Sequence, residues 1–286
     1  MTVSDAQRGG AVAGESSEAR RGGLSVLDEV FTTARAESRA ALIAYLPAGY
    51  PTVAGSTGLL TQALDAGADL VEVGLPYSDP VLDGPVIQRA VDTALRGGVR
   101  VRDTLSVVET LASRGGRAVV MTYWNPVLRY GPEAFARDLA AAGGLGVITP
   151  DLVPDEENGW LAATTAHDIA PIFLVAPSSS EQRIAMTTSV TRGFLYAAST
   201  MGVTGARDAV SDTAATLVER VRRHTDLPVG VGLGVRSGAQ ASEIAAFADG
   251  VIVGSAMVSA AEHGRAAVAR LTSELAAGVR GNHTGR

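Results

Sequence analysis

The sequence predicts a single (β/α)8 barrel, also called a TIM barrel, with one extra helix before the first strand. Short β-rich runs alternate with longer amphipathic runs, which is the element order of an α/β protein with a parallel sheet. Eight such strand–helix units can be counted, the number that closes a barrel. The chain has 286 residues, and a barrel of this kind uses about 250 residues as one domain.

The chain begins with residues 1–23, where Gly, Ala, Ser, Glu and Arg recur without periodicity, and we expect a disordered tail there. A helix is expected next, because one helical stripe carries the apolar side chains Leu27, Val30, Phe31 and Ala34. The barrel is expected over residues 24–278. Residues 279–286 carry no pattern and are expected to fray.

The predicted strands are short runs rich in branched apolar residues, as buried strands of a parallel sheet are. They cover residues 41–46, 70–74, 118–122, 146–149, 171–175, 193–197, 228–232 and 250–253. Helical patterns between them cover residues 57–66, 101–113, 132–142, 156–167, 180–190, 208–224, 239–246 and 260–276. A doubly wound sheet is the competing fold, but no Rossmann-type glycine motif follows the first strand.

Composition excludes several classes of function. With 24 Lys and Arg against 30 Asp and Glu, the formal charge of −6 argues against nucleic acid or an acidic membrane as a partner. There is no cysteine, and the four histidines show no metal spacing, so no metal site is expected. No apolar run approaches the roughly 18 residues that span a bilayer. We therefore expect a cytoplasmic protein.

The second predicted strand contains a carboxylate that its apolar neighbours do not explain. Glu72 lies between Val71 and Val73, and a buried carboxylate is costly unless it is paired, neutralised or used. The predicted strands contain no Arg or Lys to pair with it, which favours a catalytic role. Asp83 ends the proline-braced loop after this strand; alone it is typical of a turn. Because strand ends form the active site of a barrel, we predict that the two acids form an acid/base pair.

Glycine-bearing turns follow the last three predicted strands, at residues 202–205, 232–237 and 254–255. Glycine lets backbone N–H groups approach an anion closely, and a following helix adds a favourable dipole. Turns after strands seven and eight hold phosphate in many barrels. Each turn alone is ordinary, but together they predict a small phosphorylated substrate.

Aromatic residues near other strand ends could line a substrate pocket. Each of these tyrosines could equally well be an ordinary core residue. Tyr45 lies near the end of the first predicted strand, and Tyr123 and Asn125 follow the third. Tyr196 shares a strand face with Phe194 by alternation.

These residues resemble the alpha subunit of tryptophan synthase over about residues 24–277. The most specific stretch is residues 70–85, with the sequence LVEVGLPYSDPVLDGP. It is joined by GVTG at 202–205, GLG at 232–234 and VGS at 253–255. One departure is Tyr50, where many relatives carry an aspartate before the proline.

The resemblance implies a lyase of tryptophan biosynthesis, which cleaves indole-3-glycerol phosphate to indole and glyceraldehyde 3-phosphate by a retro-aldol reaction. Glu72 then matches the acid/base glutamate, and Asp83 matches the aspartate that binds the indole N–H. Tyr196, Tyr45, Tyr123 and Thr204 are expected to contact substrate, with Thr204 in a loop that closes over it.

The phosphate is expected at Gly205, Gly234, Gly254 and Ser255, again by resemblance. No cofactor is expected in this chain. Pyridoxal phosphate is expected only in a beta-subunit partner, in an alpha2beta2 heterotetramer that passes indole from one subunit to the other. Asp79 and the proline loop would face that partner.

Two other interpretations stay open at this point. One is another phosphate-binding barrel enzyme, such as a phosphosugar isomerase, although the isomerase of phosphoribosylanthranilate uses a cysteine that this chain lacks. The other is a catalytically weak subunit whose main role is to bind and activate a partner.

Overall fold

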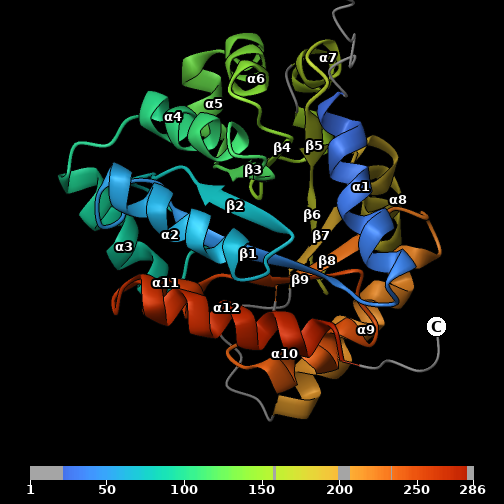
Figure 1. The fold of residues 1–286 in the computed structure, drawn as a ribbon. Coiled ribbons are helices and arrows are strands. Elements are labelled where there is room, and N and C mark those ends of the chain that lie inside the picture. Colours follow the sequence, from blue (N-terminus) through green and yellow to red (C-terminus); the bar gives the residue numbers. More distant parts are fainter. Residues whose placement is uncertain (1–21, 157–158, 199–206, 233, 282–286) are drawn as a thin grey trace, which may run out of the picture.

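A central barrel of parallel strands is surrounded by helices in the computed structural model, which describes residues 22–156, 159–198, 207–232 and 234–281 (Figure 1). The strands in these residues are β1 Ala41–Pro47, β2 Leu70–Gly74, β3 Ala118–Met121, β4 Gly146–Ile148, β5 Ala170–Ile172, β6 Leu174–Val175, β7 Leu195–Ala198, β8 Val229–Gly232 and β9 Gly250–Val253. The helices are α1 Gly23–Ala36, α2 Val53–Asp65, α3 Pro85–Arg96, α4 Val101–Ala112, α5 Trp124–Tyr130, α6 Pro132–Ala141, α7 Trp160–Ala166, α8 Glu181–Val190, α9 Arg207–Arg222, α10 Gly238–Ala245, α11 Ser255–Ala261 and α12 Arg265–Val279, with a short 3-10 turn at Pro154–Glu156.

The strands confirm the predicted barrel, with one strand broken in two. The order is β5-β4-β3-β2-β1-β9-β8-β7-β6, and all neighbours are parallel. The predicted strand at residues 171–175 is interrupted at Phe173, because its first part pairs with β4 and its second part with β7. The Tyr196 N–H donates to the Phe173 carbonyl at 3.1 Å, so this stretch joins the two ends of the strand order.

Helix α1 is the extra helix, and it closes the end of the barrel where the strands begin. Its buried stripe packs against inward-facing strand residues, which include Ile43, Leu70, Val119, Ile148, Ile172, Phe194 and Ile252. The rings of Phe31 and Phe194 lie 5.2 Å apart. Helix α1 therefore fills the barrel interior at the N-terminal ends of the strands. The C-terminal ends of the strands are left to form a site.

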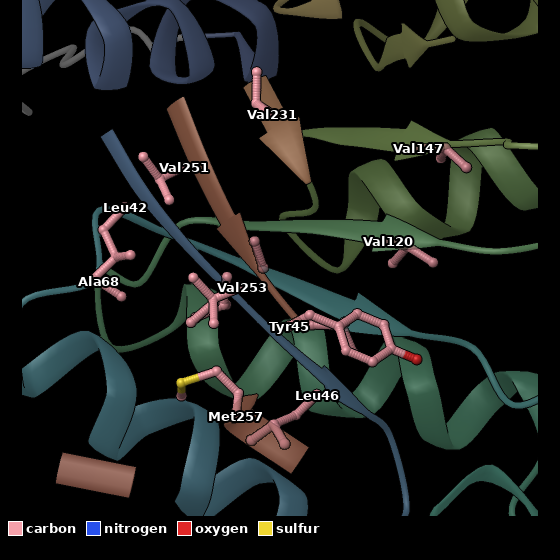
Figure 2. Close-up of a cluster of buried hydrophobic side chains, with 14 of the residues drawn as sticks. Leu42, Tyr45, Leu46, Ala68, Val120, Val147, Val231, Val251, Val253 and Met257 are labelled. Atoms are coloured by element: carbon pink, nitrogen blue, oxygen red, sulfur yellow. The ribbon is translucent and has the colours of Figure 1, made fainter. Parts of the chain in front are cut away.

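Outward-facing residues of the strands form the second core, against the surrounding helices. Figure 2 shows them around β1, with Met257 of α11 among them: Leu42, Leu46, Val120, Val147, Val231, Val251 and Val253. With apolar residues on both faces, β1 is buried along its whole length.

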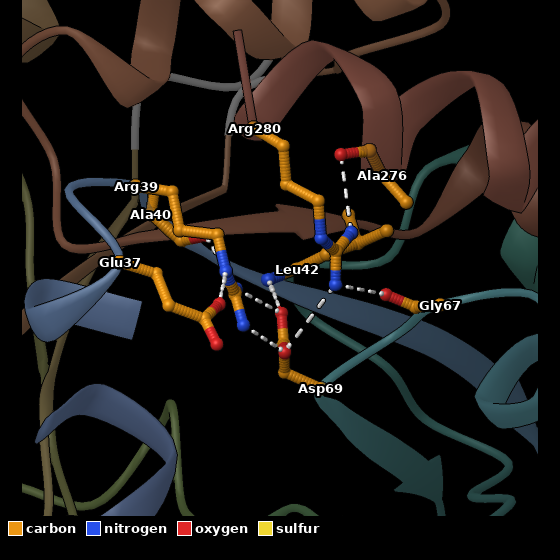
Figure 3. Close-up of polar contacts among 8 residues, drawn as sticks. All are labelled: Glu37, Arg39, Ala40, Leu42, Gly67, Asp69, Ala276 and Arg280. Carbon is orange, nitrogen blue, oxygen red and sulfur yellow. Dashed lines mark hydrogen bonds and ion pairs between the residues drawn. The ribbon is translucent and has the colours of Figure 1, made fainter. Parts of the chain in front are cut away.

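A network of charged groups ties together the starts of β1 and β2 and the end of α12 (Figure 3). Arg39, which is 6% exposed, donates to both carboxylate oxygens of Asp69 at 2.8 Å. Asp69 also accepts the Leu42 N–H at 2.8 Å. Arg280 donates to the Gly67 carbonyl at 3.2 Å and lies 3.7 Å from Asp69. Asp69 immediately precedes β2, so the network holds the strand that carries Glu72.

Helices α3, α5 and α11 were not among the predicted helical patterns. Pro85 occupies the first turn of α3 with Gly84 as its N-cap, so the loop after β2 ends at Gly84. Helices α5 and α11 have seven residues each, too few for a periodic pattern to emerge. All three pack at or near the end of the barrel where the strands finish.

Candidate active site

Glu72 points into the barrel from the middle of β2. It is paired in register with Tyr45 of β1 and Val119 of β3, and it is 1% exposed. Its neighbours along the strand are apolar, and its Oε2 atom has no hydrogen-bond partner among the described residues. A buried, unpaired carboxyl oxygen at this position is available to a ligand in the barrel mouth.

The protonation of Glu72 follows from this burial. Desolvation and, to a smaller extent, the charge of Asp83 together raise the pKa of the carboxyl from its ordinary value of 4.5 to about 8. At neutral pH the group is therefore mostly a neutral acid. This is the state that a general acid needs before it donates a proton.

Asp83 lies in the loop between β2 and α3 and is half-buried. Burial raises the pKa of its carboxyl, while a hydrogen bond with Tyr123 lowers it. The side-chain amide of Gln88 donates to the Asp83 carbonyl at 2.8 Å. The two predicted acids therefore interact, since the charge of Asp83 raises the pKa of Glu72.

Three tyrosines surround the two acids. Burial raises the pKa of Tyr45 and Tyr196 well above the ordinary value, and the charges of Glu72 and Asp83 add to the effect in both. Burial likewise raises the pKa of Tyr123 to about 12. The three phenols are therefore neutral hydrogen-bond donors at neutral pH.

Two of these tyrosines require glycine on the neighbouring strand. A Cβ atom at Gly74 would lie 2.7 Å from Cε2 of Tyr45, and one at Gly232 would collide with the Tyr196 hydroxyl. The absence of a side chain at Gly232 therefore leaves room for Tyr196. From the sequence, this glycine was predicted only as part of a phosphate-binding turn.

The predicted phosphate residues are placed in part. Gly254 precedes α11 as its N-cap, and Ser255 is the first residue of that helix. A Cβ atom at Gly254 would contact Ile87 at 3.5 Å and Tyr45 at 3.7 Å, so this turn borders the aromatic wall of the site. Gly234 has a φ of 53°, with open space where a side chain would be. Thr204 and Gly205 lie outside the described residues.

Asp151 is a residue of the site region that the sequence patterns did not single out. It follows β4, and both its carboxylate oxygens accept the Trp124 N–H, at 2.9 and 3.1 Å. Asn125, which was singled out, donates to the Tyr77 hydroxyl at 3.0 Å. The signal that would have found Asp151 is its place at a strand exit, as for Glu72 and Asp83.

Among the described residues, no group of three or more His, Asp or Glu side chains is arranged to hold a metal ion. Within the same part of the chain, no helix is long and apolar enough to cross a membrane.

A nearly closed parallel barrel with a buried glutamate and a second carboxyl at its mouth is the arrangement of a (β/α)8-barrel enzyme. Residues 31–283 match the family described as Tryptophan synthase alpha chain. The chain belongs to this family.

Individual relatives agree with the family match. A tryptophan synthase alpha chain of Nocardia farcinica is 65% identical over 256 residues, covering 90% of this chain and 96% of the relative. One of Mycobacterium tuberculosis is 64% identical over 269 residues, covering 94% and 98%.

Solved structures show the same fold. A structure of Mycobacterium tuberculosis tryptophan synthase superposes with a TM-score of 0.86 at 63% identity, covering 90% of this chain and 98% of that one. The alpha chain of Legionella pneumophila gives 0.82 at 29% identity, covering 91% and 99%.

Family membership confirms the resemblance found in the sequence and the activity that it implied. The chain is a carbon–carbon lyase of tryptophan biosynthesis, which cleaves indole-3-glycerol phosphate to indole and glyceraldehyde 3-phosphate. Its family is not one of pyridoxal-phosphate enzymes. The phosphosugar isomerase is thereby set aside.

Proposed function

We propose that Glu72 is the acid/base group of this cleavage and that Asp83 binds the indole nitrogen. The observation that carries the proposal is the Oε2 atom of Glu72, which is buried and has no hydrogen-bond partner among the described residues. A carboxyl with a pKa of about 8 holds its proton at neutral pH, ready for transfer to carbon.

The reaction needs a proton on C3 of the indole ring before the bond from C3 to the glycerol carbon can break. Neutral Glu72 delivers that proton, and positive charge develops at the ring nitrogen. The Asp83 carboxylate accepts the N–H there and stabilises the charge. Burial raises the pKa of Asp83, and its hydrogen bond with Tyr123 opposes that rise, which favours the carboxylate that this role needs.

The cleavage also releases a proton from the hydroxyl on the glycerol carbon next to the ring. Once Glu72 has donated its proton it is a carboxylate, and it takes up the hydroxyl proton as the C–C bond breaks and the aldehyde forms. The bonding electrons return to the ring, which restores indole. Glu72 ends protonated as it began, so one residue can serve both transfers.

The substrate phosphate is assigned to the turns that follow β7, β8 and β9, at Gly205, Gly234, Gly254 and Ser255. A Cβ atom placed at Gly254 would lie 3.7 Å from the Tyr45 ring, and Tyr45 is paired in register with Glu72, so this turn lies near the predicted acid. Tyr45 and Tyr196 are assigned to the walls around the indole ring. Thr204 is assigned to the loop that covers the substrate.

A beta subunit carrying pyridoxal phosphate is proposed as the partner, in an alpha2beta2 assembly. Support comes from large apolar side chains that are exposed on the loop after β2, Val81 at 71%, and on helix α5, Leu128 at 50% and Tyr130 at 36%. A hollow of about 410 Å³ beside them is lined in part by Tyr77, Asn125 and Tyr130. Asp79 lies in the same exposed loop.

The test is to incubate the purified chain with indole-3-glycerol phosphate and measure indole, with and without a beta subunit. We expect indole from the chain alone and faster release with the partner. Indole that appears only with the partner would reduce the chain to an activating subunit. No indole in either mixture would contradict the proposed site chemistry.

A further inference from the structure

The loop that carries Asp83 is held by few contacts, and most of them come from one short segment. Between Tyr77 and Gly84 the loop is exposed or half-buried. The segment of residues 123–125, at the exit of β3, contacts this loop at several points. We call it the β3 exit segment.

Tyr123 makes the contacts closest to Asp83. Its hydroxyl accepts the N–H of Leu82, the residue directly before Asp83, at 3.0 Å, and hydrogen bonding from Tyr123 lowers the pKa of the Asp83 carboxyl. A phenol has one proton to donate and lone pairs to accept, so both bonds can be made at once. The rings of Tyr123 and Tyr77 lie 5.5 Å apart, and Asn125 donates to the Tyr77 hydroxyl.

The β3 exit segment is itself held from the next strand. Asp151 receives the Trp124 N–H on both of its carboxylate oxygens, which satisfies a free N–H at the start of α5. The Trp124 ring packs edge-on against Trp160 at 5.7 Å. A continuous series of contacts therefore runs from Asp151 through the peptide between Tyr123 and Trp124 to Asp83.

We propose that Tyr123 and Asp151 are positioning residues for the cleavage reaction: Asp151 holds the β3 exit segment, and Tyr123 in turn fixes the place of Asp83. This rests on the proposed role of Asp83 at the indole nitrogen. Misplacing a group by about 1 Å can cost on the order of 100-fold in rate. Tyr123 was expected to contact substrate, and the bond to Asp83 gives it a second task.

The first experiment is a double-mutant cycle on kcat/KM for indole formation, with Tyr123→Phe, Asp83→Asn and the double variant. The phenylalanine keeps the ring contact with Tyr77 and removes only the hydroxyl. Losing a hydrogen bond to a charged group should lower kcat/KM by about 10-fold or more in the wild-type background. If Tyr123 acts through Asp83, the same change should cost less than about 3-fold in Asp83→Asn. Equal costs in both backgrounds would overturn the proposal.

A pH profile gives a readout that a purely structural role would not move. The charge of Asp83 acts on Glu72 of β2, Tyr45 of β1, Tyr123 and Tyr196 of β7. Of these, Tyr123 lowers the pKa of Asp83. Tyr123→Phe should therefore shift the acidic limb of kcat/KM to higher pH, because Asp83 then binds its proton more tightly. An unshifted limb would contradict the assignment.

Asp151 is tested by removal and by rescue. Asp151→Ala should lower kcat/KM by roughly 3- to 10-fold, and this loss should largely vanish in the Tyr123→Phe background. Asp151→Asn keeps one acceptor for the Trp124 N–H and should recover most of the rate. Asp155→Ala is the matched control. Asp155 follows the same strand and is exposed, and the ion pair that it makes with Arg183 is a weak one, with an N–O distance of 3.6 Å. A loss in the control as large as in Asp151→Ala would refute the role of Asp151.

These outcomes are separable from failure of the proposed function. A wild-type chain that forms no indole would remove the proposed function itself. A chain that forms indole but is unaffected by Asp83→Asn would remove the role of Asp83. Only a cycle in which Asp83 matters and Tyr123 acts independently counts against the positioning inference alone.

Discussion

Replacing Glu72 with glutamine should make the protein more stable near neutral pH, although it should greatly slow the chemistry. The side chain is 1% exposed, and its pKa is raised from 4.5 to about 8. Below pH 4.5 the carboxyl is protonated in both the folded and the unfolded chain. Between pH 4.5 and 8 only the folded chain holds the proton, so the free energy of unfolding of the wild type falls by about 1.4 kcal/mol per pH unit. A glutamine carries no such dependence.

The magnitude follows directly from this slope. From pH 5 to pH 7 the stability of Glu72→Gln should rise relative to wild type by about 2–3 kcal/mol, and the difference should stop growing above about pH 8. Urea unfolding of both proteins at pH 5, 6, 7 and 8 measures it. Glu109→Gln, on the exposed side of α4, is the matched control for the loss of one surface charge. A difference that stays constant from pH 5 to pH 8 would refute the account of how Glu72 is buried and protonated.

Three further predictions follow from the contacts described above. Asp83→Asn should lower kcat/KM by about 10- to 100-fold, because an amide does not stabilise positive charge at the indole nitrogen, while inhibition by glyceraldehyde 3-phosphate is retained; unchanged kinetics would make Asp83 a turn residue only. Asp69→Ala should destabilise the fold by about 3 kcal/mol, since the buried Arg39 loses its bidentate partner and keeps only its ion pair with the exposed Glu37, whereas Arg280→Ala should cost about 1 kcal/mol; urea unfolding that gives equal losses would contradict the network in Figure 3. Gly232→Ala should displace Tyr196 and lower kcat/KM, and the same change should cost less in a Tyr196→Phe background; equal losses in both backgrounds would show that the Tyr196 hydroxyl is not what requires glycine there.

The strands and the barrel could be predicted from the sequence, because each strand is a short apolar run that is buried on both faces. Glu72 could be singled out because it is an acid within such an apolar run, at β2. The structure shows that its side chain is buried. The stretch at residues 171–175 was predicted as one strand. Its break at Phe173 arises from pairing with two different neighbours, which no local pattern encodes.

The features missed in the sequence share a dependence on distant partners. Arg39 and Asp69 are separated by 30 residues, and their pairing appears only once β1 and β2 lie side by side. Asp151 is separated by 27 residues from the Trp124 N–H that it accepts. Helices α5 and α11 were missed because each is a two-turn element. In the segments that follow the strands, the type of residue at the strand end was therefore a better guide to the site than helical periodicity.

The central claim is that Glu72 supplies the proton for cleavage, and indole formation by Glu72→Gln tests it most directly. Glutamine has nearly the same shape but no proton to transfer at neutral pH. We predict that the variant binds indole-3-glycerol phosphate about as well as wild type and loses about 10²- to 10⁴-fold in single-turnover rate of indole formation. A variant that binds substrate and turns it over at close to the wild-type rate would contradict the claim.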